Sequence, residues 1–299
     1  MSVIAAREML KRIIEWGTSR DDIRGVVLLG SQARRERPAD EWSDIDLAVF
    51  ADGPDRYLTS SDWLAPLGRV LVTTVESSAL GGGREHRALF ASGLDVDFNF
   101  VPTAAAGALA AVADDPAVRS VLGRGFRVLV DKLNLTDVLE PFARLDTTPG
   151  SRLIDEATYT RLSREFWYHL IWAAKKLRRG EAWVAKTVSD RLNTDLVELI
   201  AWYTMLHHPD ADTWHGGRFL EEWADPHLLG ALGRAVAIYD QAHIADALRQ
   251  QAALFEQLES DSCRLAGFAV AVPHTELAAQ LEAILEPWSR RPKSSWPAG

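Results

Sequence analysis

The spacing of apolar residues changes near the middle of this chain, and this change limits the possible folds more than any other feature. In the first half, short runs rich in β-branched residues alternate with glycine, proline and polar turns, which is typical of strands. The runs are 25–29, 45–50, 69–75, 94–101 and 126–130. From about residue 152, apolar residues recur at helical spacing instead. The helical stretches are 153–179, 181–206, 227–258 and 274–287.

These patterns predict an α+β protein with two domains. An amphipathic helix over 2–16 opens the N-terminal domain, whose strands we expect to form a mixed sheet flanked by helices. The C-terminal domain is predicted to be all helical. Residues 145–151 have the composition of a turn and separate the two patterns. The expected domains are therefore 1–150 and 151–299, and a chain of 299 residues is long enough to bury two cores.

The composition disfavours several classes of protein. The apolar runs are far shorter than the ~20 residues that cross a bilayer, and the N-terminus lacks the apolar stretch of a signal peptide. The single cysteine, Cys263, allows neither an internal disulfide nor a cysteine-based structural zinc site. The formal net charge of −9 disfavours a general nucleic-acid partner and is compatible with a small polycationic ligand. We therefore expect a cytoplasmic monomer without a membrane or nucleic-acid partner.

Two aspartates, Asp44 and Asp46, stand at the start of an apolar strand. Side chains alternate along a strand, so both carboxylates point to one face while Ile45 and Leu47 point into the core. Two aligned carboxylates repel each other unless a cation lies between them. Mg²⁺ suits such a pair, because it binds one or two carboxylates and fills its remaining positions with water and substrate phosphates.

A second strand repeats this pattern with Asp95, Asp97 and Asn99 on one face. If this strand lies beside the first, three or four carboxylates converge on one point. Such a cluster is unfavourable without a metal, so its convergence would indicate a functional site.

Gly30 and Ser31 directly follow the strand predicted over 25–29. A glycine at this point lets backbone amides approach a ligand closely, and a helix that begins here adds its dipole. The pair is therefore a candidate phosphate-binding turn, although most Gly-Ser pairs after a strand are ordinary turns.

Together these elements resemble the active-site signature of the polymerase-β-type nucleotidyltransferases. The signature comprises Gly30-Ser31, a gap of twelve residues, Asp44-x-Asp46 and a later aspartate on a strand. In the second half, the similarity is to the aminoglycoside 6-adenylyltransferases, which inactivate streptomycin. It is carried by Glu165-Phe166-Trp167 leading to Ala174-Lys175, by the segment 196–203 and by Gly217-Arg218. The resemblance extends from the opening helix to about residue 260.

The resemblance implies a reaction. It implies Mg²⁺-dependent transfer of AMP from ATP to a hydroxyl of an aminoglycoside, with streptomycin the expected acceptor and antibiotic resistance the result. It assigns Asp44, Asp46 and Asp97 as catalytic carboxylates and metal ligands. Gly30 and Ser31 are expected to contact the β- and γ-phosphates.

The role of Asp97 has two alternatives. It is either the ligand of a second ion or the general base that takes the proton of the acceptor hydroxyl. Asp97 is preferred to Asp95 because the family pattern places an aspartate at this distance before Val101-Pro102.

The helical half is expected to supply the remaining contacts. Lys175 lies at the edge of the predicted buried stripe of its helix, where it can reach phosphates or lie in solvent. Glu165, Asp195 and Glu198, with Trp202 four residues after Glu198, are candidate acceptor-binding residues. Carboxylates beside a tryptophan suit a guanidinium or ammonium group. The alternative for each residue is an ordinary surface charge or a core tryptophan.

Two other functions stay open at this stage. One is an enzyme of the same fold that modifies a lincosamide or a protein hydroxyl. The other is a non-catalytic nucleotide-binding protein. The complete set of Asp44, Asp46 and Asp97 argues against the second, because a chain without catalysis has no reason to keep a repulsive carboxylate cluster.

Overall fold

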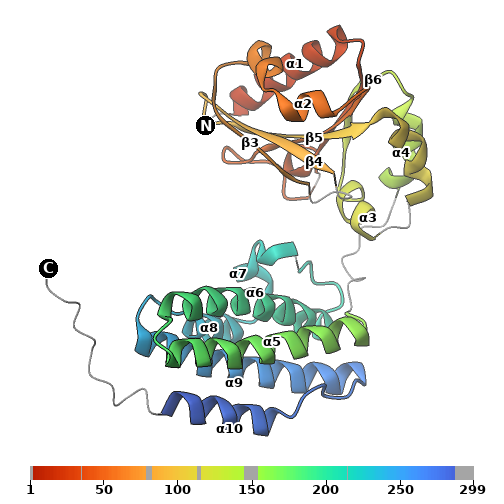
Figure 1. The fold of residues 1–299 in the computed structure, drawn as a ribbon. Coiled ribbons are helices and arrows are strands. Elements are labelled where there is room, and N and C mark those ends of the chain that lie inside the picture. Colours follow the sequence, from red (N-terminus) through yellow and green to blue (C-terminus); the bar gives the residue numbers. More distant parts are fainter. Residues whose placement is uncertain are drawn as a thin grey trace, which may run out of the picture. The chain divides into compact units, whose positions relative to one another are not determined.

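A computed structural model describes residues 3–34, 36–78, 83–112, 116–144, 154–213 and 215–286. The chain forms two compact units, Met1–Thr147 and Thr148–Gly299, and each is described by itself (Figure 1). The turn predicted over 145–151 lies outside the described residues. None of the helices within the described ranges is long and apolar enough to cross a membrane.

The first unit is built on a six-stranded sheet with the order β3-β4-β5-β2-β1-β6. The strands are β1 (Ile23–Leu29), β2 (Ile45–Ala51), β3 (Val70–Ser77), β4 (Arg84–Phe90), β5 (Asp95–Pro102) and β6 (Arg127–Asp131). Strand β5 pairs with β2 in parallel, whereas the other neighbours are antiparallel. The predicted mixed sheet is therefore confirmed, and it contains one strand that the sequence pattern did not predict. The missed strand is β4, whose sequence REHRALF contains no β-branched residue.

One face of this sheet packs against α1 (Val3–Ser19), α2 (Asp55–Thr59) and the 3-10 helix η2 (Asp62–Leu67) (Figure 1). The alternation of β2 and β5 directs apolar side chains to this face. They are Ile45, Leu47, Val49, Val96, Phe98 and Phe100, and all are buried. This packing fixes which side chains of β2 and β5 point to the opposite face.

The opposite face carries a smaller core over β1 and β2. Val27, Leu29 and Phe50 pack there against η3 (Thr103–Val112), α3 (Pro116–Leu122) and α4 (Leu135–Ala143). Asp44, Asp46 and Asp97 belong to this face and lie where β2 and β5 begin.

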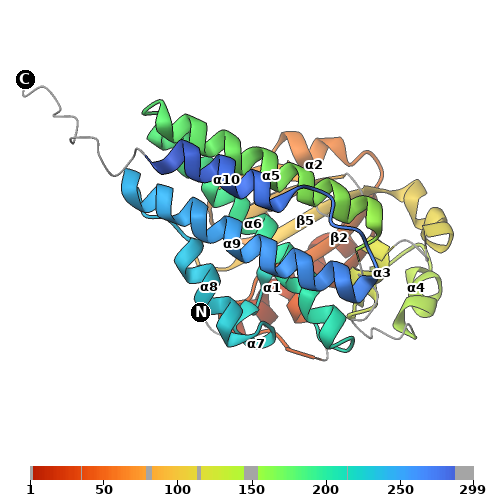
Figure 2. The same ribbon diagram turned by 90° about the horizontal axis from the view of Figure 1, so that it is seen from below.

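The second unit consists of helices. They are α5 (Glu156–Arg178), α6 (Ala182–His207), α7 (Leu220–Trp223), α8 (Pro226–Ala235), α9 (Gln241–Ala266) and α10 (His274–Leu285). The apolar stripe predicted on α5 is buried at Leu162, Phe166, Leu170, Ala174 and Leu177. Figure 2 shows α10 alongside α5 and α9. The all-helical C-terminal half is thus confirmed.

The single helix predicted over 227–258 is wrong, because the structure has α8 and α9 there. Val236 is extended, and Asp240 begins α9 by accepting hydrogen bonds from the amides of Ala242 and His243.

A buried polar group ties three of these helices together. Glu259 on α9 is fully buried and accepts a hydrogen bond from the Tyr159 hydroxyl of α5 at 2.7 Å. It also contacts Nε2 of His274 on α10. A buried carboxylate is tolerated only with such partners.

Candidate active site

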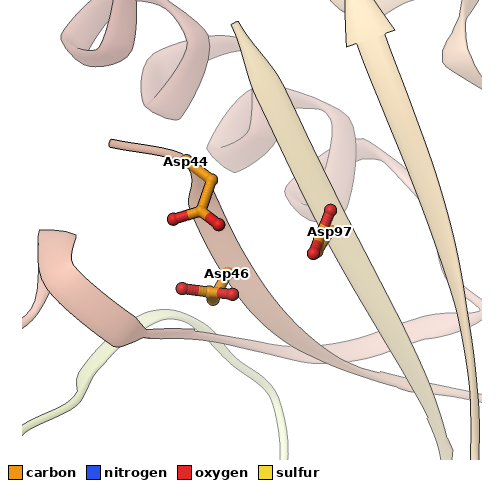
Figure 3. Close-up of side chains that lie close together, drawn as sticks. All are labelled: Asp44, Asp46 and Asp97. Carbon is orange, nitrogen blue, oxygen red and sulfur yellow. The ribbon is translucent and has the colours of Figure 1, made fainter. Parts of the chain in front are cut away.

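Three carboxylates converge at the beginning of two neighbouring strands. Asp44 immediately precedes β2, Asp46 lies within it, and the parallel register places Asp46 opposite Asp97 of β5. One oxygen of each carboxylate lies within 4.8 Å of the others, and all three residues are half-buried (Figure 3). The convergence predicted from the two alternating patterns is therefore observed. Asp95 is exposed and is not part of this group.

A turn before β2 sets the position of Asp44. The Asp40 carboxylate accepts hydrogen bonds at 2.9 Å from the Trp42 amide and from the Ser43 hydroxyl. These bonds hold the pKa of Asp40 below its usual value. The charged aspartate thus closes the turn from which the chain enters the strand.

The environment of Asp97 disfavours its charged form. Burial raises the pKa of Asp97 to about 7, with further contributions from the negative charges of Asp46, Glu85 and Asp44. The Arg87 guanidinium acts in the opposite direction. A cation bound among the three carboxylates would offset this repulsion. Half-buried oxygen ligands at this spacing fit Mg²⁺.

Gly30 allows Asp46 to occupy its place. It begins the short helix η1 (Gly30–Gln32) directly after β1, with a positive φ of 62°. A Cβ atom at this position would lie 1.8 Å from Oδ2 of Asp46, so the carboxylate packs against the glycine itself. The next residue, Ser31, has a buried hydroxyl with no hydrogen-bond partner among the residues that the structure describes. An orphaned hydroxyl in the turn that packs against Asp46 fits a missing polar ligand such as a phosphate.

Two residues of this site, Glu85 and Arg87 on β4, were not predicted from the sequence. Arg87 lies opposite Asp97 in the antiparallel register, and its Nε is 3.3 Å from Oδ2 of Asp97. The same Nε donates a hydrogen bond at 2.7 Å to Oε1 of Glu85. Their spacing in the sequence could have indicated a shared face, because Glu85 and Arg87 stand two residues apart, as Asp44 and Asp46 do.

In the second unit, three predicted acceptor-binding carboxylates lie near one another. Asp195 of α6 is half-buried, and burial raises its pKa. The charges of Glu198 and of Glu165 on α5 raise this pKa further, whereas Arg191 and His169 lower it. Nη2 of Arg191 is 3.9 Å from Oδ2 of Asp195, and this oxygen has no hydrogen-bond partner within the described part of the chain. Glu165 and Glu198 are exposed.

The prediction that Trp202 binds the acceptor is wrong. Trp202 is fully buried, with its ring packed against those of Tyr159 and Phe268. It continues the apolar stripe of Leu196 and Leu199 at helical spacing, so its ring faces the core and not a ligand.

Lys175 lies in the last turn of α5 and is exposed. It lines a surface depression of about 580 Å³. Trp172, Lys176, Arg178, Arg179 and Ile284 complete the lining. The helix dipole stabilises cations at a helix C-terminus, so a lysine is expected at this position with or without a phosphate ligand.

Comparison with known proteins assigns the family. A family model described as streptomycin adenylyltransferase matches residues 4–277. The chain belongs to this family. It is therefore a nucleotidyltransferase, as its carboxylate cluster indicated.

Individual relatives are distant. An aminoglycoside 6-adenylyltransferase of Campylobacter jejuni is 21% identical over 271 residues, which are 87% of this chain and 88% of that one. Another, from Bacillus subtilis (strain 168), is 24% identical over 209 residues, 66% of this chain and 68% of the relative. The crystal structure of an aminoglycoside 6-adenyltransferase from Bacillus subtilis superimposes with a TM-score of 0.40 at 16% identity, covering 92% of this chain and 97% of that chain.

Proposed function

We propose that this nucleotidyltransferase transfers AMP from ATP to a hydroxyl of an aminoglycoside, with streptomycin the first candidate, and so inactivates the antibiotic. The observation that carries the proposal is the convergence of Asp44, Asp46 and Asp97 beside the Gly30-Ser31 turn. The names of the relatives support an aminoglycoside as the acceptor.

The reaction demands positioning and charge neutralisation more than covalent chemistry by the protein. The acceptor oxygen forms a bond to the α-phosphorus of ATP, and the bond to the departing pyrophosphate breaks. Asp44, Asp46 and Asp97 would hold Mg²⁺, which neutralises phosphate charge and orients the triphosphate when bound. The Ser31 hydroxyl and the backbone at Gly30 would contact the β- and γ-phosphates, and Lys175 is the proposed phosphate contact of the helical unit.

Asp97 would serve in one of two ways. As a general base, it takes the proton that the acceptor hydroxyl loses. As a ligand of a second ion, it leaves that proton to solvent. A pKa near 7 suits a general base, because such a group exchanges protons readily at neutral pH.

We assign nucleotide chemistry to residues 1–150 and acceptor binding to 151–299. Glu165, Asp195 and Glu198 form the proposed acceptor surface. Asp195 is half-buried with 17% of its side chain exposed, and a ligand guanidinium would pair with the exposed part of its carboxylate.

The test is a transfer assay with purified protein, ATP, Mg²⁺ and a panel of aminoglycosides, with a lincosamide added as a different acceptor. We expect pyrophosphate release and an aminoglycoside whose mass has increased by that of one AMP group. Asp44→Asn is the control, because it keeps the shape of the side chain and removes its charge. Turnover only with the lincosamide, or no transfer to any acceptor, would contradict the proposal.

A further inference from the structure

Arg87 belongs to the same row of the sheet as the carboxylate cluster. The register runs across four strands, from Asp46 on β2 through Asp97 on β5 and Arg87 on β4 to Thr74 on β3. All four side chains stand on one face, because cross-strand neighbours share a face. Arg87 is thus adjacent to the site by strand pairing.

The position of this guanidinium is fixed mainly by Glu85. Both Nε and Nη2 of Arg87 donate to Oε1 of Glu85, which is buried. Nη1 lies 3.7 Å from Oε2 of Glu76 on β3. The hydrogen bond to Glu85 raises the pKa of Arg87, so the group stays charged. Because Glu85 holds it, the cation would stay in place if the Asp97 carboxylate bound another ligand.

About 45% of the Arg87 side chain is exposed, whereas only 16% of the Asp97 side chain is. The guanidinium therefore borders the cluster on its solvent side. The other contacts of the guanidinium are with the carboxylates of Glu85 and Glu76. It is close enough to repel a metal ion held by Asp97 and to attract the phosphates that accompany such an ion.

We propose that Arg87 is a positioning residue that makes metal binding depend on the nucleotide, an inference that rests on the proposed function. In the free protein it holds Asp97 and neutralises part of the cluster, so a divalent cation alone binds weakly. When the cation arrives with a triphosphate, the same positive charge stabilises the phosphates. Arg87 thereby favours the metal–nucleotide complex over the bare ion.

The test compares two affinities in one set of variants. Binding of Mn²⁺ alone is measured by electron paramagnetic resonance at pH 8. Binding of a non-hydrolysable ATP analogue with Mg²⁺ is measured by calorimetry. At water-like screening, a unit charge and a divalent charge about 6 Å apart repel enough to change affinity roughly tenfold.

We expect Arg87→Leu to bind Mn²⁺ alone roughly tenfold more tightly and the nucleotide complex roughly tenfold more weakly. Arg87→Lys, which keeps the charge, should stay within about threefold of the wild-type values in both. Arg84→Leu is the matched control, because Arg84 is an exposed residue of the same strand on the opposite face. It loses the same charge and should change neither affinity.

Opposite shifts distinguish this role from a structural one, since a disordered site would weaken both affinities. Weaker or unchanged Mn²⁺ binding in a folded Arg87→Leu variant would overturn the inference. The outcome is separable from the proposed function, because Mn²⁺ binding needs no acceptor. If the wild-type protein fails to modify aminoglycosides, the proposed function is refuted, but the Mn²⁺ affinities of the variants still test the role of Arg87.

Discussion

Replacing Gly30 by alanine should separate the catalytic geometry of the site from its stability. The added Cβ would lie 1.8 Å from Oδ2 and 2.7 Å from Cγ of Asp46. Since contacts of a Cβ below 3.0 Å do not occur, Oδ2 has to move by at least about 1.2 Å. This displacement takes the carboxylate out of a cluster whose three oxygens lie within 4.8 Å of one another.

The expected loss follows from this displacement. A misplacement of about 1 Å at a reacting centre can cost roughly 10²-fold in rate, so we expect kcat for AMP transfer to fall at least about 100-fold. The positive φ of 62° adds about 1–2 kcal/mol of backbone strain, which appears as lost stability.

Gly53 provides the matched control. Its φ is 71°, so Gly53→Ala introduces similar strain, but no heavy atom surrounds the new Cβ within 4 Å. Both variants should lose about 1–2 kcal/mol of unfolding free energy in urea titrations, whereas only Gly30→Ala should lose transfer activity. If kcat of the two variants agrees within about threefold, the packing of Asp46 against Gly30 does not matter for catalysis and the reasoning is refuted.

Three further predictions concern single carboxylates. Asp97 is protonated below its pKa of about 7 and can then neither accept a proton nor hold a cation, so kcat/KM should fall as the pH is lowered through 7. If Asp97 is the base, Asp97→Asn should lower kcat by about 10²–10⁴-fold and leave the nucleotide affinity unchanged. A weaker nucleotide affinity would instead indicate that Asp97 is a metal ligand. Asp195→Asn should raise the acceptor KM about ten- to a hundredfold without changing the ATP KM, since a poorly hydrated charge pair contributes about 1.5–3 kcal/mol. Glu165→Gln, at an exposed site, should weaken acceptor binding by under about 1 kcal/mol. Small effects of equal size in both variants would show that the acceptor binds elsewhere. Glu259→Ala should lower the unfolding free energy by about 3–5 kcal/mol, because it leaves buried partners unpaired. Glu276→Ala, at an exposed position of α10, is its control in the same urea titration.

The central strands could be predicted from sequence because each satisfies a simple local rule. Apolar residues at 45, 47 and 49 and at 96, 98 and 100 alternate with Asp46, Asp97 and Asn99, and so predict both the buried face and the carboxylate face. The strands β2 and β5 match the predicted runs 45–50 and 94–101 to within one residue. The pairing of these two strands could not be predicted, because the alternation within a strand does not determine which strand lies beside it. The observed register supplied the missing fact by placing Asp46 opposite Asp97.

The errors arose where a residue's environment depends on distant packing. On a helix, positions four apart lie close to one side, so Glu198 and Trp202 were assigned together, yet the packing against Tyr159 buries only the tryptophan. The break between α8 and α9 was missed because residues 236–240 contain neither glycine nor proline.

The sequence determines the positions of the carboxylate cluster and of its counterion Arg87 in different ways. Asp44, Asp46 and Asp97 follow from two alternating strands, whereas Arg87 reaches the cluster only because β4 adds to β5 in one register. A shift of β4 by one residue would turn Arg87 to the other face while the three aspartates kept their places. The charge balance of the site thus depends on a strand that carries none of the recognised motif, so the motif alone does not determine how strongly this site binds a bare cation.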